Sequence, residues 1–144
     1  MDIIQYLNNL KRSLTYERLL NHVWKDERVQ KRIISLNTFN QLFDSGVDSD
    51  GNSLGDYSPV SVQKYGKPEG HIRLYDTGAF YESFKIIVKG VVAEITANTQ
   101  KEDIDLADEY GEAIIGLTNE SKESLTVTIK EVVKEYLRKS LSVN

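Results

Sequence analysis

Apolar residues recur at helical spacing through the first 45 positions of the chain. They fall into three short stripes, with steps of mostly three or four residues: Ile3, Leu7 and Leu10, then Leu20, Val23 and Trp24, then Val29, Ile33, Leu36 and Phe43. Such steps place apolar side chains on one face of a helix. Because neither Pro nor Gly occurs before Gly46, we expect residues 1–45 to form an N-terminal helical segment.

The next segment, residues 46–70, concentrates the residues that interrupt regular structure. It holds five of the nine glycines and both prolines, and these residues favour turns over helices and strands. Loops of this length inside a compact domain are usually functional or disordered. We therefore predict an extended loop here that serves as a contact arm.

Alternation replaces helical spacing after residue 83. Over positions 84–89, Phe84, Ile86 and Val88 alternate with Lys85, Ile87 and Lys89. A second alternating run follows Gly90 over positions 91–97. Two such runs around a turn that contains Gly predict an antiparallel β-hairpin.

Helical signals return towards the end of the chain. Residues 103–110 are expected to form a short helical turn that ends at Gly111, and residues 113–117 to form a third strand. A closing helix then begins, with Thr118 or Ser121 as its N-cap. One face of this helix is apolar, and it consists of Leu125, Ile129, Val132, Val133, Tyr136 and Leu137.

Together these elements predict an α+β fold. Its parts are N-terminal helices, a long Gly/Pro-containing loop, a small antiparallel β-sheet and a C-terminal helix packed on that sheet. In this arrangement we expect Phe84, Ile86 and Ile95 to be buried between the hairpin and the closing helix. The helix residues expected to cover them are Leu125, Ile129 and Tyr136.

The length of 144 residues corresponds to one ordinary domain. We divide it into the helical segment 1–45, the arm 46–70 and a unit of hairpin sheet plus C-terminal helix over 71–144. No apolar run reaches the roughly 18 to 20 residues that cross a bilayer, so we expect no membrane contact.

Charge is distributed unevenly along the chain. The formal net charge of −4 argues against a nucleic-acid binder, because binding to phosphates needs clustered Lys and Arg. Residues 1–45 have a net charge of +2, whereas the remainder has −6. Nine carboxylates lie between Glu94 and Glu123. Such polarity is typical of solvated faces or of an assembly surface that meets a complementary one.

The residue types needed for common enzyme chemistry are scarce. The chain has no cysteine, and its two histidines, His22 and His71, lie far apart in sequence. Neither a nucleophile elbow nor a nucleotide-binding glycine motif occurs. The triplet Asp76-Thr77-Gly78 is similar to that of aspartic proteases, but those enzymes need two such sites. We predict a protein that is not an enzyme and that uses no cofactor, with His22 a partly buried helix residue.

One loop pattern is similar to a calcium site. Asp48, Asp50 and Asn52 have the alternate spacing of the first ligands in a calcium-binding loop. However, Ser53 stands where that loop needs Gly, and Pro59 stands where it needs a bidentate Glu. We interpret the segment as a polar turn without a metal.

Three motifs appear in a fixed order over about residues 40–140. They are Gly46-x-Asp48-x-x-Gly51-x-x-Leu54-Gly55-x-Tyr57-Ser58-Pro59, then Leu74-x-Asp76-Thr77-Gly78-x-Phe80-Tyr81-x-Ser83-Phe84, then Ala107-Asp108-Glu109-Tyr110-Gly111 before the closing helix. This combination resembles small neck or tail-completion proteins, the head-to-tail connectors of tailed bacteriophages. It resembles most those of crAss-like and other Bacteroidetes phages.

The resemblance implies a structural virion protein. It implies a homo-oligomeric ring in the virion neck, assembled in the bacterial host cytoplasm between the portal and neighbouring neck or tail proteins. DNA would pass through such a ring without specific binding. The alternative function is a soluble binding module for a cation or a basic partner.

Two segments are the expected surfaces for subunit or partner contacts. The expected contact residues are Tyr57, Pro59 and Tyr65 in the arm, and Asp103, Asp105 and Glu112 in the acidic segment. Two roles remain open for the acidic residues. In the first, some of Glu102, Asp103, Asp105 and Glu112 face the lumen and repel DNA phosphates. In the second, the acidic segment pairs with basic residues of the adjacent subunit. Those basic residues would be Lys11, Arg12, Arg28, Lys31 or Arg32.

Overall fold

The computed structural model describes residues 2–13 and 15–142. In chain order its elements are α1 (Ile3–Ser13), α2 (Tyr16–Lys25), α3 (Glu27–Ser35), the π-helix η1 (Leu36–Ser45), α4 (Pro59–Tyr65), α5 (Ala79–Glu82), β1 (Lys85–Lys89), β2 (Val92–Thr96), β3 (Gln100–Lys101), β4 (Ile104–Asp105), α6 (Leu106–Tyr110), the 3-10 helix η2 (Glu112–Ile114) and α7 (Asn119–Leu141). The fold is α+β, as predicted, with two small antiparallel sheets in the described residues.

The N-terminal segment is helical, as its spacing predicts, but it bends at Asp26. This residue has extended backbone angles, and its side chain accepts a hydrogen bond from the backbone nitrogen of Arg28. It therefore ends α2 and caps the start of α3. The chain continues from α3 into η1 without a break, because Leu36 keeps right-handed helical angles. Gly46, in the left-handed conformation, ends η1.

The predicted hairpin is confirmed. Strands β1 and β2 pair antiparallel, with Ile86 opposite Ile95, and Gly90 turns the chain with a φ of 62°. The turn is tied to α2 by a side chain, since the indole nitrogen of Trp24 donates to the carbonyl oxygen of Val91 at 2.8 Å.

The closing helix α7 begins at the predicted cap. The Thr118 side chain accepts a hydrogen bond from the backbone nitrogen of Ser121 at 3.1 Å, so Thr118 rather than Ser121 is the N-cap. Within residues 2–13 and 15–142, no helix combines the length and the apolar character needed to cross a membrane.

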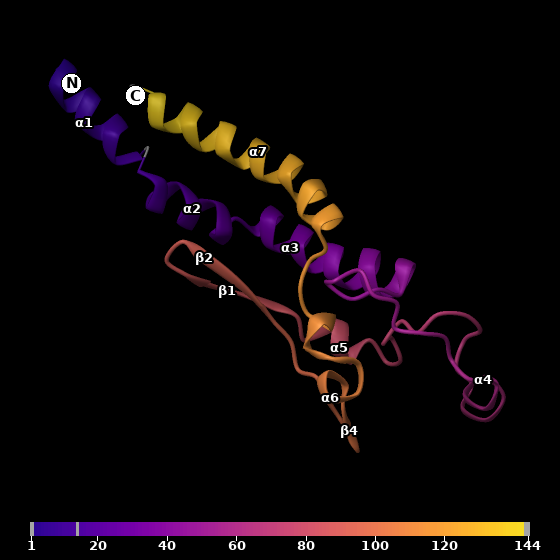
Figure 1. The fold of residues 1–144 in the computed structure, drawn as a ribbon. Coiled ribbons are helices and arrows are strands. Elements are labelled where there is room, and N and C mark those ends of the chain that lie inside the picture. Colours follow the sequence, from indigo (N-terminus) through magenta and orange to yellow (C-terminus); the bar gives the residue numbers. More distant parts are fainter. Residues whose placement is uncertain (1, 14, 143–144) are drawn as a thin grey trace.

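Helices α2 and α3 lie between the hairpin and α7 (Figure 1). The closing helix therefore reaches the sheet mainly through these two helices. Ile86 and Ile95 are half-buried and pack against the cluster that contains Leu125, but α2 and α3 intervene, which corrects their expected burial directly between the hairpin and α7. Buried members of this first cluster are Val23, Val29, Ile33, Leu36, Leu125 and Val132.

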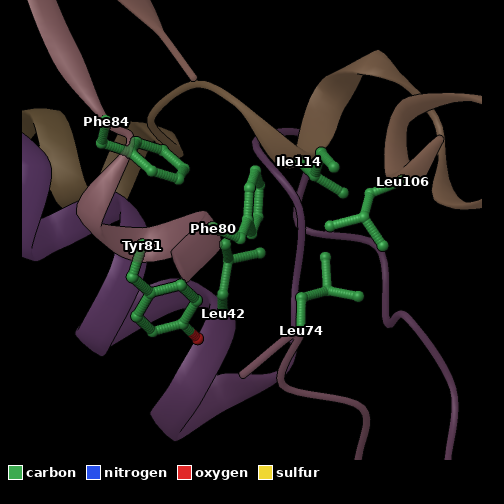
Figure 2. Packing of buried hydrophobic residues seen from close by; sticks show 7 residues of the cluster. All are labelled: Leu42, Leu74, Phe80, Tyr81, Phe84, Leu106 and Ile114. Carbon is green, nitrogen blue, oxygen red and sulfur yellow. The ribbon is translucent and has the colours of Figure 1, made fainter. Parts of the chain in front are cut away.

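Phe84 belongs to a second cluster, which corrects its expected position under α7. The ring of Phe84 lies 5.0 Å from the ring of Phe80, centroid to centroid. Figure 2 shows the seven buried side chains of this cluster converging on one another. They are Leu42, Leu74, Phe80, Tyr81, Phe84, Leu106 and Ile114. Phe80 lies in α5 and Phe84 follows that helix, and both rings pack in the cluster that contains Leu42 of η1 and Ile114 of η2.

The predicted third strand over 113–117 is wrong. Residues 112–114 form the 3-10 helix η2 instead, and side chains of η1 take the place of a neighbouring strand. Asn37 bonds to the backbone of Ile114 and Gly116. Gln41 bonds to the backbone of Gly116 and Thr118. Because side-chain amides satisfy these backbone groups, no strand partner is needed.

The long loop predicted over 46–70 is not confirmed as one irregular stretch. Two isolated β-bridges join Val47 to Ser53 and Asp56 to His71, and helix α4 occupies residues 59–65. The helix forms there because Ser58 caps it and Pro59 stands in its first turn, where the missing N–H of proline costs nothing.

Candidate functional site

The tip of the arm presents apolar side chains to solvent. Helix α4 has no buried residue, and Val60 and Tyr65 are 62% and 66% exposed. Pro59 is also exposed. Figure 1 shows α4 projecting from the rest of the chain. Exposed apolar side chains on a projecting element favour a contact surface. Two of the predicted contact residues, Pro59 and Tyr65, lie at this tip.

The root of the arm is held in place. The backbone nitrogen of Tyr57 donates to the carbonyl oxygen of Gly70 at 3.0 Å, and His71 Nε2 donates to the carbonyl oxygen of Phe43 at 2.6 Å. Tyr57 is half-buried, and its hydroxyl accepts a long hydrogen bond from the backbone nitrogen of Arg73. Tyr57, the third predicted arm residue, therefore lies at the root and away from the tip.

We name residues 100–105 the acidic turn. They comprise β3, β4 and the two residues between these strands, Glu102 and Asp103. Glu102 and Asp103 are exposed, and Ile104 beside them is 44% exposed. The carboxylate of Asp105 has a structural task, since it caps α6 by accepting from the backbone nitrogen of Ala107 at 2.8 Å. A hydrogen bond with the Thr99 side chain lowers the pKa of Asp105.

The predicted contact carboxylates therefore differ in their surroundings. Asp103 projects at the acidic turn, whereas Asp105 holds the start of α6. Glu112 is exposed at the start of η2. Lys101, in β3, lies 3.6 Å from a carboxylate oxygen of Asp76.

A groove of about 810 Å³ lies between α2, the hairpin turn and α7. We name it the basic groove, because three exposed cations line it: Arg18, Lys25 and Lys89. Half-buried Val91 and Tyr136 contribute apolar surface. Glu17 is the carboxylate among the lining residues. The sequence analysis missed this site, because Lys89 is distant in the chain from the two cations of α2.

Two of the basic residues expected to meet a neighbouring subunit have partners in their own chain. Arg28 contacts Glu135 at 2.6 Å and Asp26 at 3.0 Å. Lys31 contacts Glu27 at 2.8 Å. By contrast, no ion pair involves Arg18 or Lys25 within the described part of the chain. Arg18 and Lys25 therefore keep accessible positive charge in the basic groove, and other exposed cations such as Lys11 and Arg12 do so elsewhere on the surface.

The segment similar to a calcium loop forms a polar turn held by one of its own carboxylates. One carboxylate oxygen of Asp48 accepts hydrogen bonds from the backbone nitrogens of Asp50 and Asn52, at 2.9 and 3.0 Å. The carboxylate therefore shapes the backbone of its own loop. Over residues 2–13 and 15–142, no three His, Asp or Glu residues are grouped so that they could hold a metal ion.

Both histidines make structural contacts. The ring of His22 lies 4.5 Å from the ring of Tyr136, and His22 is exposed, which corrects its expected partial burial. His71 bonds to the Phe43 carbonyl at the root of the arm. Asp76, from the Asp-Thr-Gly triplet, lies 3.6 Å from Lys67 and from Lys101.

A group of aromatic rings near the arm is a second feature that the sequence analysis missed. Phe39 contacts Tyr81, and Phe43 contacts Tyr75. Phe39 and Tyr75 are 51% and 41% exposed. Burial raises the pKa of Tyr81, and its hydroxyl donates to the carbonyl oxygen of Arg73. The spacing of four between Phe39 and Phe43 is the signal that could have indicated this group.

Comparisons with known proteins give no relative: no family model matches the chain, and neither a curated protein nor a solved structure is significantly similar to it.

Proposed function

We propose that this chain is a structural virion protein of a tailed bacteriophage, a ring-forming neck or tail-completion subunit that joins portal and tail. The observation that favours this function most is the separation of two unlike charged surfaces. The two sheets follow one another along the molecule (Figure 1). The acidic turn, at β4, and the hairpin turn beside the basic groove lie at opposite ends of the region that these sheets form (Figure 1). Unlike, complementary surfaces are what head-to-tail association into a closed ring requires.

The arm provides a further surface for assembly. Its tip has two exposed apolar side chains, Val60 and Tyr65, while its root is fixed by the bridge between Asp56 and His71. An exposed apolar tip on a fixed root is suited to a partner outside the ring. We assign it to the portal or to a neighbouring neck or tail protein.

The proposed location is the virion neck, after assembly in the host cytoplasm. In this setting DNA passes through the ring without specific binding. The net charge of −4 supports this, because binding to DNA depends on clustered Lys and Arg that neutralise phosphates and release counterions from the DNA. The proposed role needs neither an active site nor a cofactor.

Electron microscopy and native mass spectrometry test this function. The purified chain is examined alone and after mixing with the portal protein of the phage that would encode it. We expect ring-shaped particles of one stoichiometry that bind the portal. A chain that never forms rings, never binds a portal and lies outside a cluster of portal, capsid and tail genes would contradict the proposal.

The alternative, a binding module for a cation or a basic partner, receives less support. Its cation version would use Asp48, whose carboxylate is engaged by the backbone of its own loop. Its basic-partner version predicts tight binding of a basic peptide at the acidic turn without any ring. The same mass spectra would reveal that outcome.

A further inference from the structure

We propose that the basic groove of one chain receives the acidic turn of a second copy. This contact would join neighbouring subunits of the ring, and it therefore rests on the proposed function. The groove contributes Arg18, Lys25 and Lys89. The turn contributes Glu102 and Asp103.

Charge complementarity is the first argument. Arg18 and Lys25 are exposed and have no ion pair among the described residues. Lys89 pairs with Glu94 at 3.2 Å, but both side chains are largely exposed, at 70% and 52%. Exposed pairs of this kind contribute little free energy, so Lys89 is available to exchange its partner. Glu102 and Asp103 of the acidic turn take part in no ion pair among the described residues.

Apolar complementarity is the second argument, and it is independent of charge. Ile104, beside the two carboxylates, is 44% exposed. In the groove, Val91 and Tyr136 offer half-buried apolar surface. A volume of about 810 Å³ lies within the roughly 300–1,000 Å³ typical of ligand sites, which is ample for the side chains of one turn. Ile104 would pack on Val91 and Tyr136. Glu102 and Asp103 would then form ion pairs with the cations of the groove.

Both partners of the contact are held in shape before they meet. The groove is fixed on one side by Asn21, whose side-chain nitrogen donates to the carbonyl oxygen of Gly90 at 3.0 Å. The turn is fixed by the pairing of Gln100 with Asp105 and by the Asp105 cap on α6. Preformed surfaces lose less conformational entropy on binding.

The contact must be between chains, because the two surfaces lie at opposite ends of the region that the two sheets form (Figure 1). It is also heterologous, since different surfaces of each copy take part. Heterologous contacts close into rings when the rotation between copies allows it and otherwise extend into filaments.

Disulfide trapping tests the contact directly, because the chain has no cysteine of its own. A chain with Lys25→Cys is mixed with a chain with Asp103→Cys under mild oxidation. We expect a mixed disulfide dimer to be the main product. The matched control replaces Lys25→Cys by Lys130→Cys, at an exposed position of α7 outside the groove. Equal yields from the two mixtures would overturn the proposal.

A chain with both substitutions separates this contact from the ring itself. A disulfide ladder that ends in one closed species supports both. An open ladder without a closed species supports the contact and contradicts the ring. Rings seen by electron microscopy without any ladder contradict the contact and leave the proposed function standing.

Charge exchange gives a second test that does not depend on cysteine. The groove variant Arg18→Glu with Lys25→Glu, and the turn variant Glu102→Lys with Asp103→Lys, should each associate at least about tenfold more weakly than the parent chain. Mixing the two variants should restore association between them. Lys130→Glu serves as the control and should change nothing. Failure of the mixture to associate, with both variants folded, would overturn the contact.

Discussion

The side-chain oxygen of Asn37 accepts a hydrogen bond from the backbone nitrogen of Gly116 at 2.7 Å, although 79 positions separate the two residues. The nitrogen of the same amide donates to the carbonyl oxygen of Ile114 at 2.9 Å. Gln41, one turn further along η1, repeats the arrangement with Gly116 and Thr118. Two amides thus hold the chain between η2 and α7, which sets where the closing helix begins.

Replacing Asn37 should therefore destabilise the whole fold. Asn37→Leu leaves the Ile114 carbonyl and the Gly116 N–H without partners, and each unsatisfied buried group costs about 1–3 kcal/mol. We expect the free energy of unfolding in urea to fall by about 2–4 kcal/mol. Asn40→Leu, at an exposed position of the same helix, is the control. Equal effects of the two substitutions would show that the amide contacts contribute no stability.

Gly46 and Gly51 form a matched pair for testing the root of the arm. Both have positive φ, at 63° and 80°, but a Cβ on Gly46 would lie 2.6 Å from the His71 ring, whereas nothing lies within 4 Å of one on Gly51. Gly51→Ala should cost about 1–2 kcal/mol for its backbone alone. Gly46→Ala should cost about 1–3 kcal/mol more, because of overpacking. Thermal denaturation of both variants measures this difference, and its absence would mean that His71 moves freely aside.

Phe84 should be essential to the second cluster. Phe84→Ala removes a ring that is only 5% exposed, and such truncations cost about 3–5 kcal/mol. Phe39→Ala, at a position that is 51% exposed, should lose its ring contacts with Tyr81 and Phe43, each worth about 0.5–1.5 kcal/mol. Urea denaturation and soluble yield compare the two variants. A Phe84→Ala protein as stable as Phe39→Ala would place Phe84 outside the core.

The ion pairs of Arg28 should make stability depend on pH. Hydrogen bonds from Arg28 lower the pKa of both Asp26 and Glu135. Carboxylates with a lowered pKa stabilise the fold above their unfolded pKa of about 4, and this stabilisation is lost as the pH falls through the folded pKa. The difference in unfolding free energy between the parent chain and Arg28→Met should be constant above about pH 5 and shrink below about pH 4. If the difference in unfolding free energy persists at about pH 2, it comes from packing of the Arg28 stem and not from the ion pairs. The variant Lys130→Met is the control for general charge effects.

The arm should respond to assembly more than any other segment. Helix α4 has no buried residue, so its amides should exchange rapidly in the isolated chain and its peptide bonds should be cleaved early by proteases. Binding to a portal or neck partner should protect it. Hydrogen exchange measured in both states tests this, with the buried face of α7 as an internal reference. Equal exchange of α4 in the two states would remove the arm from the contact surfaces.

Local signals in the sequence determined the secondary structure of most of the chain. The helical stripes before residue 46, the alternation around Gly90 and the Thr118 cap each depend on backbone preferences of neighbouring residues, which act without the rest of the fold. The α+β class follows from the order of these elements. Pro59 and Tyr65 are exposed, but they lie in helix α4 and not in the irregular loop that the surrounding turn-forming residues predict.

Tertiary structure alone decided which of these elements meet. Residues 113–117 form a short apolar run that predicts a strand, but side-chain amides from η1 bond to the backbone of Ile114 and Gly116. Phe84 packs against Phe80 in the second cluster and not among the α7 residues of the first. Arg28 is neutralised by Glu135, 107 positions away, whereas Arg18 and Lys25 meet Lys89 around one groove. Such pairings depend on how packed helices and strands place distant side chains, and no periodicity in a single segment contains that information.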